Sequence, residues 1–75
     1  MPHIIVKLWP GSSEEQKTLL AQRIVQEGAE ILNKGVDYFS VAFEEISPED
    51  WSEKVYKPEI DKNMSKLYKK PGYKM

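Results

Sequence analysis

The first 46 residues of this 75-residue chain carry a strand pattern, a helix pattern and a second strand pattern, and this order limits the available folds. Residues 2–9, PHIIVKLW, are β-branched and apolar with Lys7 as the only charge, which is typical of a mostly buried strand. Residues 38–46, YFSVAFEEI, alternate apolar with smaller or polar side chains, as a strand with one apolar face does. Two strands joined by a helix are expected to pair in parallel through a right-handed crossover.

The helix between the strands is predicted to run from about residue 14 to residue 32. Ser12 and Ser13 are both N-cap candidates, because Glu15 and Gln16 follow three residues after them in the capping-box pattern. Gly35 is expected to end the helix as a left-handed cap. An apolar stripe with spacings of four, four and three residues is expected to face the sheet, where a glycine lets the helix approach closely: Leu20, Ile24, Gly28 and Ile31.

The C-terminal third predicts further helix. Ser47 caps a turn that has Pro48 at its first position. Pro58 is expected either to begin or to kink the next helix, which continues to about Lys69 before Pro71-Gly72 ends it. Residues 73–75 either fray or cover a neighbouring subunit.

The fold class that follows is α/β (α+β), with residues 1–75 as a single domain whose one strand pair is extended by a partner. A chain this short buries only roughly 60% of its unfolded surface, so a lone monomer is marginal. The chain has no cysteine and one histidine, His3, so we expect neither disulfides nor a multi-histidine metal site. We expect a homo-oligomer and no cofactor.

Composition also argues against several partners. No apolar run approaches the length of a membrane span, and the first residues lack the features of a signal peptide, so a cytoplasmic location without membrane contact is expected. Residues 57–75 carry six lysines against Glu59 and Asp61, although the whole chain has a net charge of −1 and a single arginine, Arg23. This basic end either attracts anions or is a solvated helix face; a nucleic-acid partner is not expected.

Catalytic motifs are scarce, and Pro2 is the exception. The chain shows no phosphate-binding loop, dinucleotide fingerprint, metal cluster or Ser/His/Asp set. If Met1 is removed, Pro2 presents a secondary amine of fixed geometry at the start of a strand. An ordinary α-amino group has a pKa of about 7.7–8.0, and apolar surroundings lower it, so such a nitrogen can act first as general base and then as general acid. The alternative is that Pro2 simply begins the strand.

Three segments together resemble the 4-oxalocrotonate tautomerase family of the tautomerase superfamily: MPHIIVKLWPGSSEEQK, VAFEEISPEDW and KKPGYKM. The resemblance covers essentially the whole chain and is strongest to PptA-type members. It implies a β-α-β subunit in which Pro2, after methionine removal, is the base that moves a proton on an enol or conjugated keto acid. It also implies that two subunits join their strands into a four-stranded sheet, with a dimer preferred over the founders' hexamer.

This chain departs from the family's founders at their two arginines, which bind a dicarboxylic substrate. Ser12 and Ser40 stand at these positions, and neither forms a charged bidentate clamp. The founders' pocket phenylalanine aligns with Trp51, which keeps the site apolar or serves as a core or interface anchor. We therefore expect a monocarboxylate or aryl enol of the phenylenolpyruvate kind.

The remaining candidates for the substrate site come from the strands. His3 can hydrogen-bond a carboxylate, or it is a partly buried histidine with a backbone partner. Ser40 can offer its hydroxyl or its backbone N–H to an anionic oxygen. Phe39 and Leu8 line the pocket or belong to the core. Two rival functions remain, a dehalogenase of the same superfamily and a binding module without turnover.

Overall fold

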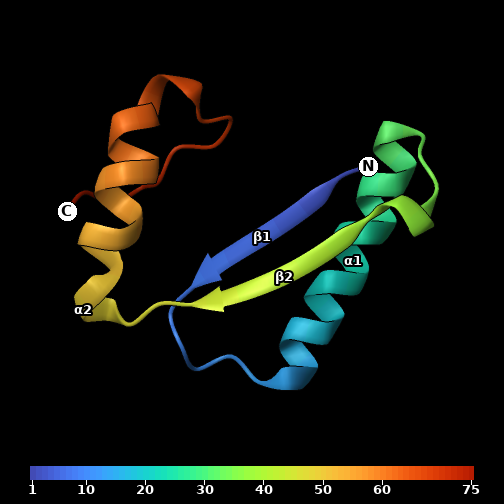
Figure 1. Ribbon diagram of the computed structural model, residues 1–75, viewed down its shortest axis with the longest axis horizontal. Helices are drawn as coiled ribbons and strands as arrows, with labels where there is room; N and C mark the ends of the chain where they lie inside the picture. The colour runs from blue at the N-terminus through green and yellow to red at the C-terminus, as the bar shows by residue number, and fades with distance from the viewer. The chain divides into compact units, whose positions relative to one another are not determined.

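The computed structural model describes all residues, 1–75, and the chain forms two compact units, Met1–Glu45 and Ile46–Met75. The first unit contains β1 (His3–Leu8), α1 (Glu14–Leu32), a 3₁₀ turn (Val36–Tyr38) and β2 (Ser40–Glu45), as Figure 1 shows. The second contains α2 (Pro48–Trp51), a π-helix (Ser52–Ile60) and a 3₁₀ helix (Asp61–Lys66). The expected β-α-β order is confirmed.

β1 and β2 pair in parallel, as predicted, in a register that runs from His3 opposite Ser40 to Leu8 opposite Glu45. Partnered residues share a face of the sheet, and successive residues alternate between faces. One face, which packs against α1, is therefore built from Ile4, Val6, Leu8, Val41, Phe43 and Glu45. The opposite face is built from His3, Ile5, Lys7, Ser40, Ala42 and Glu44.

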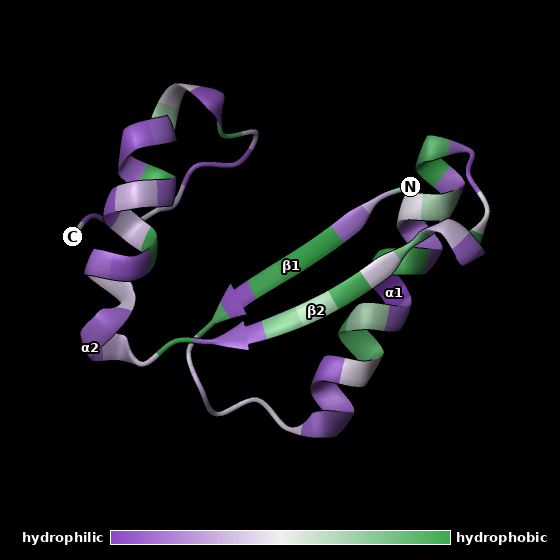
Figure 2. Cartoon of the chain, viewed as in Figure 1, coloured by the Kyte–Doolittle hydropathy of each residue, from purple (hydrophilic) through white to green (hydrophobic).

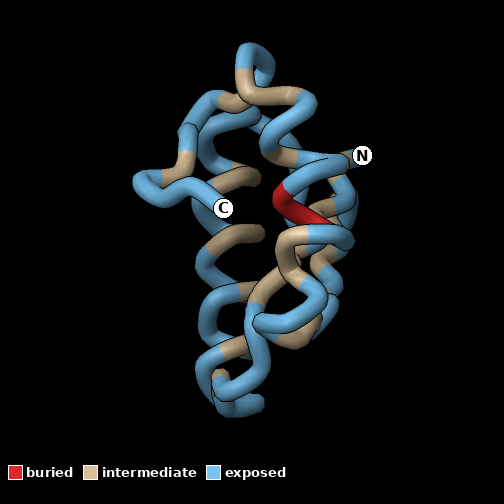
Figure 3. Tube along the Cα trace, turned by 90° about the vertical axis from the view of Figure 1, so that its left-hand side faces the viewer, coloured by how far each residue is buried: buried red, intermediate tan, exposed pale blue.

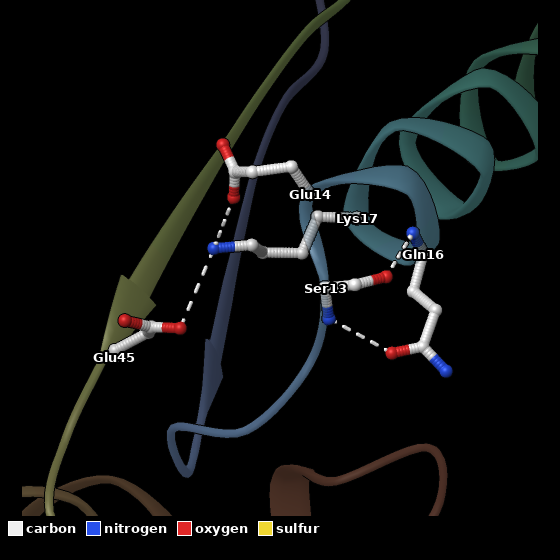
Figure 4. A network of polar contacts seen from close by, with 5 residues as sticks. All are labelled: Ser13, Glu14, Gln16, Lys17 and Glu45. Carbon is white, nitrogen blue, oxygen red and sulfur yellow. Dashed lines mark hydrogen bonds and ion pairs between the residues drawn. The ribbon is translucent and has the colours of Figure 1, made fainter.

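The start of α1 is fixed by a complete capping box on Ser13. The Gln16 backbone N–H donates to Ser13 Oγ at 3.0 Å, and the Ser13 N–H donates to Gln16 Oε1 at 2.9 Å (Figure 4). Of the two candidates, Ser13 is thus the N-cap and Ser12 lies in the preceding loop. Glu14 and Glu15 occupy the first turn, where the helix dipole favours negative charge.

The end of α1 corrects one prediction. Asn33, and not Gly35, adopts the left-handed conformation, with φ 55° and ψ 50°. Its backbone N–H donates to the carbonyls of Ala29 and Glu30. Asparagine tolerates this region better than most residues with a side chain, and Gly35, at φ −66°, instead precedes the 3₁₀ turn in an extended conformation.

The first unit has no fully buried residue, so the expectation of a mostly buried first strand is not met within one chain. Both strands are apolar over their central residues (Figure 2), yet Ile5 is 47% exposed because nothing in this unit covers its face of the sheet. On α1, Leu20 and Ile31 are exposed, whereas Ala21, Ile24, Val25 and Gly28 are partly covered. The apolar stripe of α1 is therefore only partly covered, because a sheet of two strands is too narrow to contact all of its residues.

The second unit holds the two buried residues of the chain, Val55 and Tyr56 (Figure 3, red). Ser47 and Pro48 start α2 as predicted. Of the two alternatives for Pro58, the start of a helix is wrong, because Pro58 lies inside the π-helix, where it interrupts the hydrogen-bond ladder. Proline has no N–H to donate, and the wider π turn is one way in which a helix accommodates an interrupted hydrogen-bond ladder.

The helical region also ends three residues earlier than predicted, at Lys66 rather than Lys69. Asn63 leaves helical geometry, and its side-chain amide donates to the carbonyls of Pro58 and Glu59 at 3.4 and 3.2 Å. These bonds satisfy carbonyls that a continuing helix would have paired. Leu67 is extended, so the chain leaves the helix there.

Candidate active site

Pro2 lies immediately before β1 and is held there through its carbonyl. The backbone N–H of Ser40 donates to the Pro2 carbonyl oxygen at 3.2 Å, which continues the parallel ladder by one bond beyond the strand. Pro2 is half-buried, and Met1 before it is 91% exposed. While Met1 is attached, the Pro2 nitrogen is an amide and has no basicity, but the bond that must be cut lies on the exposed side.

His3 and Ser40, two candidates that are 37 residues apart in the sequence, are brought together by the strand register. His3 Nδ1 lies 2.6 Å from Ser40 Oγ, and which of the two donates depends on the tautomer of the imidazole ring. Both side chains are exposed on the sheet face that α1 does not cover. The pair thus presents a polar group next to Pro2 in sequence and in space.

The same contacts correct one expectation about Ser40. Its backbone N–H already donates to Pro2, so it is not free to bind an anionic substrate oxygen. The hydroxyl remains, and it can exchange its bond to His3 for one to a ligand because both groups are open to solvent. The His3 partner is this side chain rather than a backbone group.

Phe39 precedes Ser40 and its side chain is directed to the other face, against α1. A Cβ built on Gly28 would lie 2.7 Å from Phe39 Cε2, so the ring occupies the space that the glycine leaves open. The expected close approach of α1 at Gly28 is therefore confirmed. Phe39 also borders an open groove of about 500 Å³ whose lining is mostly apolar and includes Ala21, Val25, Val36, Ser40 and Val41.

Leu8 lies at the opposite end of β1, where it pairs with Glu45. Leu8 is six residues after Pro2 along the strand, and a rise of about 3.3 Å per residue places the two roughly 20 Å apart. Leu8 therefore cannot line a pocket around Pro2 of its own chain. It can do so only around Pro2 of another copy.

Trp51 ends α2 in the second unit, where it is half-buried. Its indole Nε1–H donates to Tyr73 Oη at 3.2 Å, so the polar edge of the ring is already paired within the unit. The sequence predicts that residues 73–75 fray or cover a neighbouring subunit, and it does not predict this contact within the chain. The terminal KKPGY motif was the available signal, because it carries an aromatic residue just after a helix stop.

Lys17, in the first turns of α1, forms ion pairs with two carboxylates. Its ammonium lies 2.7 Å from Glu14 and 3.4 Å from Glu45, which links the first turn of α1 to the end of β2 (Figure 4). The hydrogen bond to Glu14 is the largest effect and raises the pKa of Lys17 above its usual value; burial, the next largest, lowers it, and the hydrogen bond to Glu45 raises it again. This ion pair is structural, since it lies at the Leu8 end of the sheet rather than the Pro2 end.

The fold is that of a known class of enzyme. Residues 2–54 match the family model described as "Tautomerase enzyme". The chain is 43% identical over 74 residues to Tautomerase PptA of Pectobacterium atrosepticum, covering 97% of each chain, and 40% identical over 73 residues to a probable tautomerase of Xylella fastidiosa, covering 97% of this chain and 89% of the other. Among solved structures it is similar to TomN, a 4-oxalocrotonate tautomerase homologue in the tomaymycin biosynthetic pathway, with a TM-score of 0.64, 32% identity, and coverage of 67% of this chain and 77% of that one.

The chain therefore belongs to the tautomerase family, and it is a tautomerase enzyme. The resemblance to PptA-type members that the sequence motifs indicated is confirmed by relatives of that name. None of its helices is both long enough and apolar enough to span a membrane.

Proposed function

We propose that this tautomerase interconverts the enol and keto forms of a small monocarboxylic acid, with Pro2 as general base and acid once Met1 has been removed. The neutral prolyl nitrogen takes the proton of the enol hydroxyl. The oxygen lone pair then forms the carbonyl, and the electrons of the carbon–carbon double bond take a proton back from the prolinium at carbon. The observation that best supports this role is the position of Pro2 at the start of a strand, beside the polar His3–Ser40 pair.

The His3–Ser40 pair is the proposed binding group for the substrate carboxylate. The Ser40 hydroxyl can donate to a carboxylate oxygen, and a protonated or suitably oriented imidazole adds a second donor. These two donors would bind a carboxylate more weakly than an arginine does, because an arginine forms two charge-assisted hydrogen bonds with the carboxylate oxygens. This favours a substrate with one carboxylate over a dicarboxylate.

Apolar surroundings complete the proposal. Phe39 lines a groove on the α1 face of the sheet, opposite to the face that carries the His3 and Ser40 side chains, so we assign its ring to packing against α1. We assign the apolar lining of the substrate pocket to Trp51 and Leu8 contributed by other copies of the chain. Apolar neighbours disfavour the charged prolinium and so lower the pKa of the prolyl amine toward neutrality. They also suit an aryl substrate of the phenylenolpyruvate kind.

We further propose a homo-oligomer, a dimer rather than a hexamer, with residues 1–75 acting as one tautomerase domain in the cytoplasm. The exposed Ile5, Leu20 and Ile31 support this, because a second copy would cover apolar surface that one chain leaves open. A second copy would also extend the two-stranded sheet, which is marginal alone. The mechanism uses no cofactor and no metal.

The test is phenylenolpyruvate ketonisation, measured on protein whose intact mass lacks Met1. Pro2→Ala should lower kcat/KM by about 10²–10⁴-fold, the usual contribution of a positioned general base. Pro10→Ala, outside the site, is the matched control and should retain activity, while a sample that keeps Met1 should be inactive. Activity of Pro2→Ala equal to wild type would sink the mechanism and favour a role without proton transfer.

The carboxylate assignment is tested in the same assay with Ser40→Ala. Loss of a hydrogen bond to a charged group should raise KM by about 10- to 100-fold for the free acid. The methyl ester of the substrate lacks that charge and should be affected far less. An equal effect on acid and ester would contradict the assignment of Ser40 to the carboxylate.

A further inference from the structure

The C-terminal tail returns to the helices of the second unit, where its Tyr73 contacts Trp51. After the helix stops at Lys66, the last residues loop out and turn back toward the helical segment, as Figure 1 shows in red. Tyr73 Oη accepts the indole Nε1–H of Trp51 at 3.2 Å across 22 residues of sequence. The tail therefore makes a specific polar contact rather than lying free.

The Tyr73 ring is itself held in place by the core of the unit. It contacts the ring of Tyr56, with centroids 5.7 Å apart and planes tilted by 42°. Tyr56 is one of the two buried residues of the chain, at 5% exposure, so its ring has little freedom to move away from Tyr73. Tilted aromatic pairs at this separation are stabilising beyond the area that they bury. The Tyr73 hydroxyl that accepts the hydrogen bond from Trp51 therefore belongs to a ring whose position is fixed by its contact with Tyr56.

We propose that Tyr73 is a positioning residue that fixes the orientation of the Trp51 indole and thereby sets the preference of the enzyme for planar, aryl-bearing enol acids. This inference rests on the proposed function, in which Trp51 lines the substrate pocket. An indole N–H in an apolar site needs a hydrogen-bond partner. Because the Tyr73 hydroxyl supplies one, the N–H edge is held toward the tail, and the orientation of the apolar ring is fixed with it.

Without the Tyr73 hydroxyl, the indole N–H pairs with water or a substrate oxygen instead, because this contact is open to solvent, and the ring is no longer held in one orientation. A flat aryl group then loses the ring surface against which it packs, whereas a small alkyl group depends less on that surface. The hydroxyl is therefore expected to affect KM for an aryl substrate more than kcat, since the proton transfer at Pro2 does not involve it.

The experiment uses Trp9→Phe as background, which leaves Trp51 as the only tryptophan of the chain. Tyr73→Phe removes one oxygen and keeps the ring that contacts Tyr56, so the fold is retained; a urea midpoint confirms this. Tyr68→Phe is the matched control, because Tyr68 is fully exposed, at 107%. The readouts are Trp51 emission with its quenching by acrylamide, and kcat and KM for phenylenolpyruvate and for an alkyl enolpyruvate.

Tyr73→Phe should shift the Trp51 emission and raise KM for the aryl substrate by about 3- to 10-fold, the effect of one neutral hydrogen bond. Its kcat, its alkyl KM and all values for Tyr68→Phe should change less than twofold. In a Trp51→Phe background, which has no indole N–H, Tyr73→Phe should have no further effect on the aryl KM. A Tyr73→Phe enzyme that matches Tyr68→Phe in emission or in aryl KM overturns the positioning role.

The two proposals fail separately in these measurements. If Pro2→Ala is inactive and Tyr73→Phe leaves the aryl KM unchanged, the proline mechanism stands and the role of Tyr73 is wrong. If Pro2→Ala keeps full activity, the proposed function itself is wrong, whatever the emission of Trp51 shows.

Discussion

Replacing Gly28 with alanine adds one methyl group at the point where α1 meets the ring of Phe39. The new Cβ would lie 2.7 Å from Phe39 Cε2 and 3.3 Å from Cζ, and the first distance is shorter than real carbon contacts allow. The ring must therefore move. Two effects on the free energy of unfolding then oppose each other.

Alanine in a helix interior is favoured over glycine by about 1 kcal/mol. Displacing a packed side chain to admit an extra methyl group costs about 1–3 kcal/mol. Phe39 is only half-buried, so its ring can yield, and the lower half of that range applies. The sum predicts that Gly28→Ala is neutral to destabilising, by about 0–1 kcal/mol, rather than stabilising as alanine normally is.

A double-mutant cycle with Phe39→Leu isolates the contact. In the Phe39→Leu background the clash is absent, so Gly28→Ala should stabilise the protein by about 1 kcal/mol. Urea unfolding at one fixed protein concentration measures all four proteins, because subunit association would otherwise shift the midpoints. If Gly28→Ala stabilises both backgrounds by the same amount, the ring of Phe39 does not lie against Gly28 and the packing argument is refuted.

Two further predictions concern the ends of α1. The raised pKa of Lys17, caused first by its hydrogen bond to Glu14, means that its stabilising effect is complete below the ordinary lysine value of 10.5 and is lost as pH rises through the higher folded value. The difference in melting temperature between wild type and Lys17→Met should thus be constant up to about pH 10 and shrink above 10.5; a difference that grows with pH would contradict this. At the other end, Asn33→Ala should lower stability by about 1–2 kcal/mol, because alanine is disfavoured in the left-handed region, and Asn33→Gly should not. Gly35→Ala, at φ −66° with only ordinary contacts to Tyr38, is the matched control, and an equal loss in urea midpoint there would refute the assignment of the cap.

The elements of the first unit could be predicted because each has a local signal. The capping box on Ser13 and the acidic first turn fix where α1 begins, and strand patterns on both sides of one helix leave parallel pairing as the simple solution. The sequence predicts the end of α1 at Gly35, because glycine is the commonest residue in the left-handed conformation. The chain reaches that conformation two residues earlier, at Asn33, and the preference of one residue type does not decide between such neighbours.

Other features of the structure cannot be predicted from local sequence patterns. Apolar residues such as Leu20 and Ile31 look alike in sequence whether they face their own sheet or open surface. The π-helix around Pro58 and the contact between Trp51 and Tyr73 depend on how a short segment folds back on itself, which no periodicity records. Of the candidate site, the residues Pro2, His3 and Ser40 could be proposed from the sequence, but their juxtaposition required the register.

That register is held by α1 at both ends of β2. Phe39 precedes β2 and fills the space at Gly28, while Glu45 ends it and pairs with Lys17 at 3.4 Å. A slip of one residue would turn every side chain of β2 to the opposite face, so it would break both contacts at once. It would also turn Ser40 away from His3. The helix, which carries none of the proposed catalytic groups, is therefore what places the Ser40 hydroxyl beside His3 at the Pro2 end of the sheet.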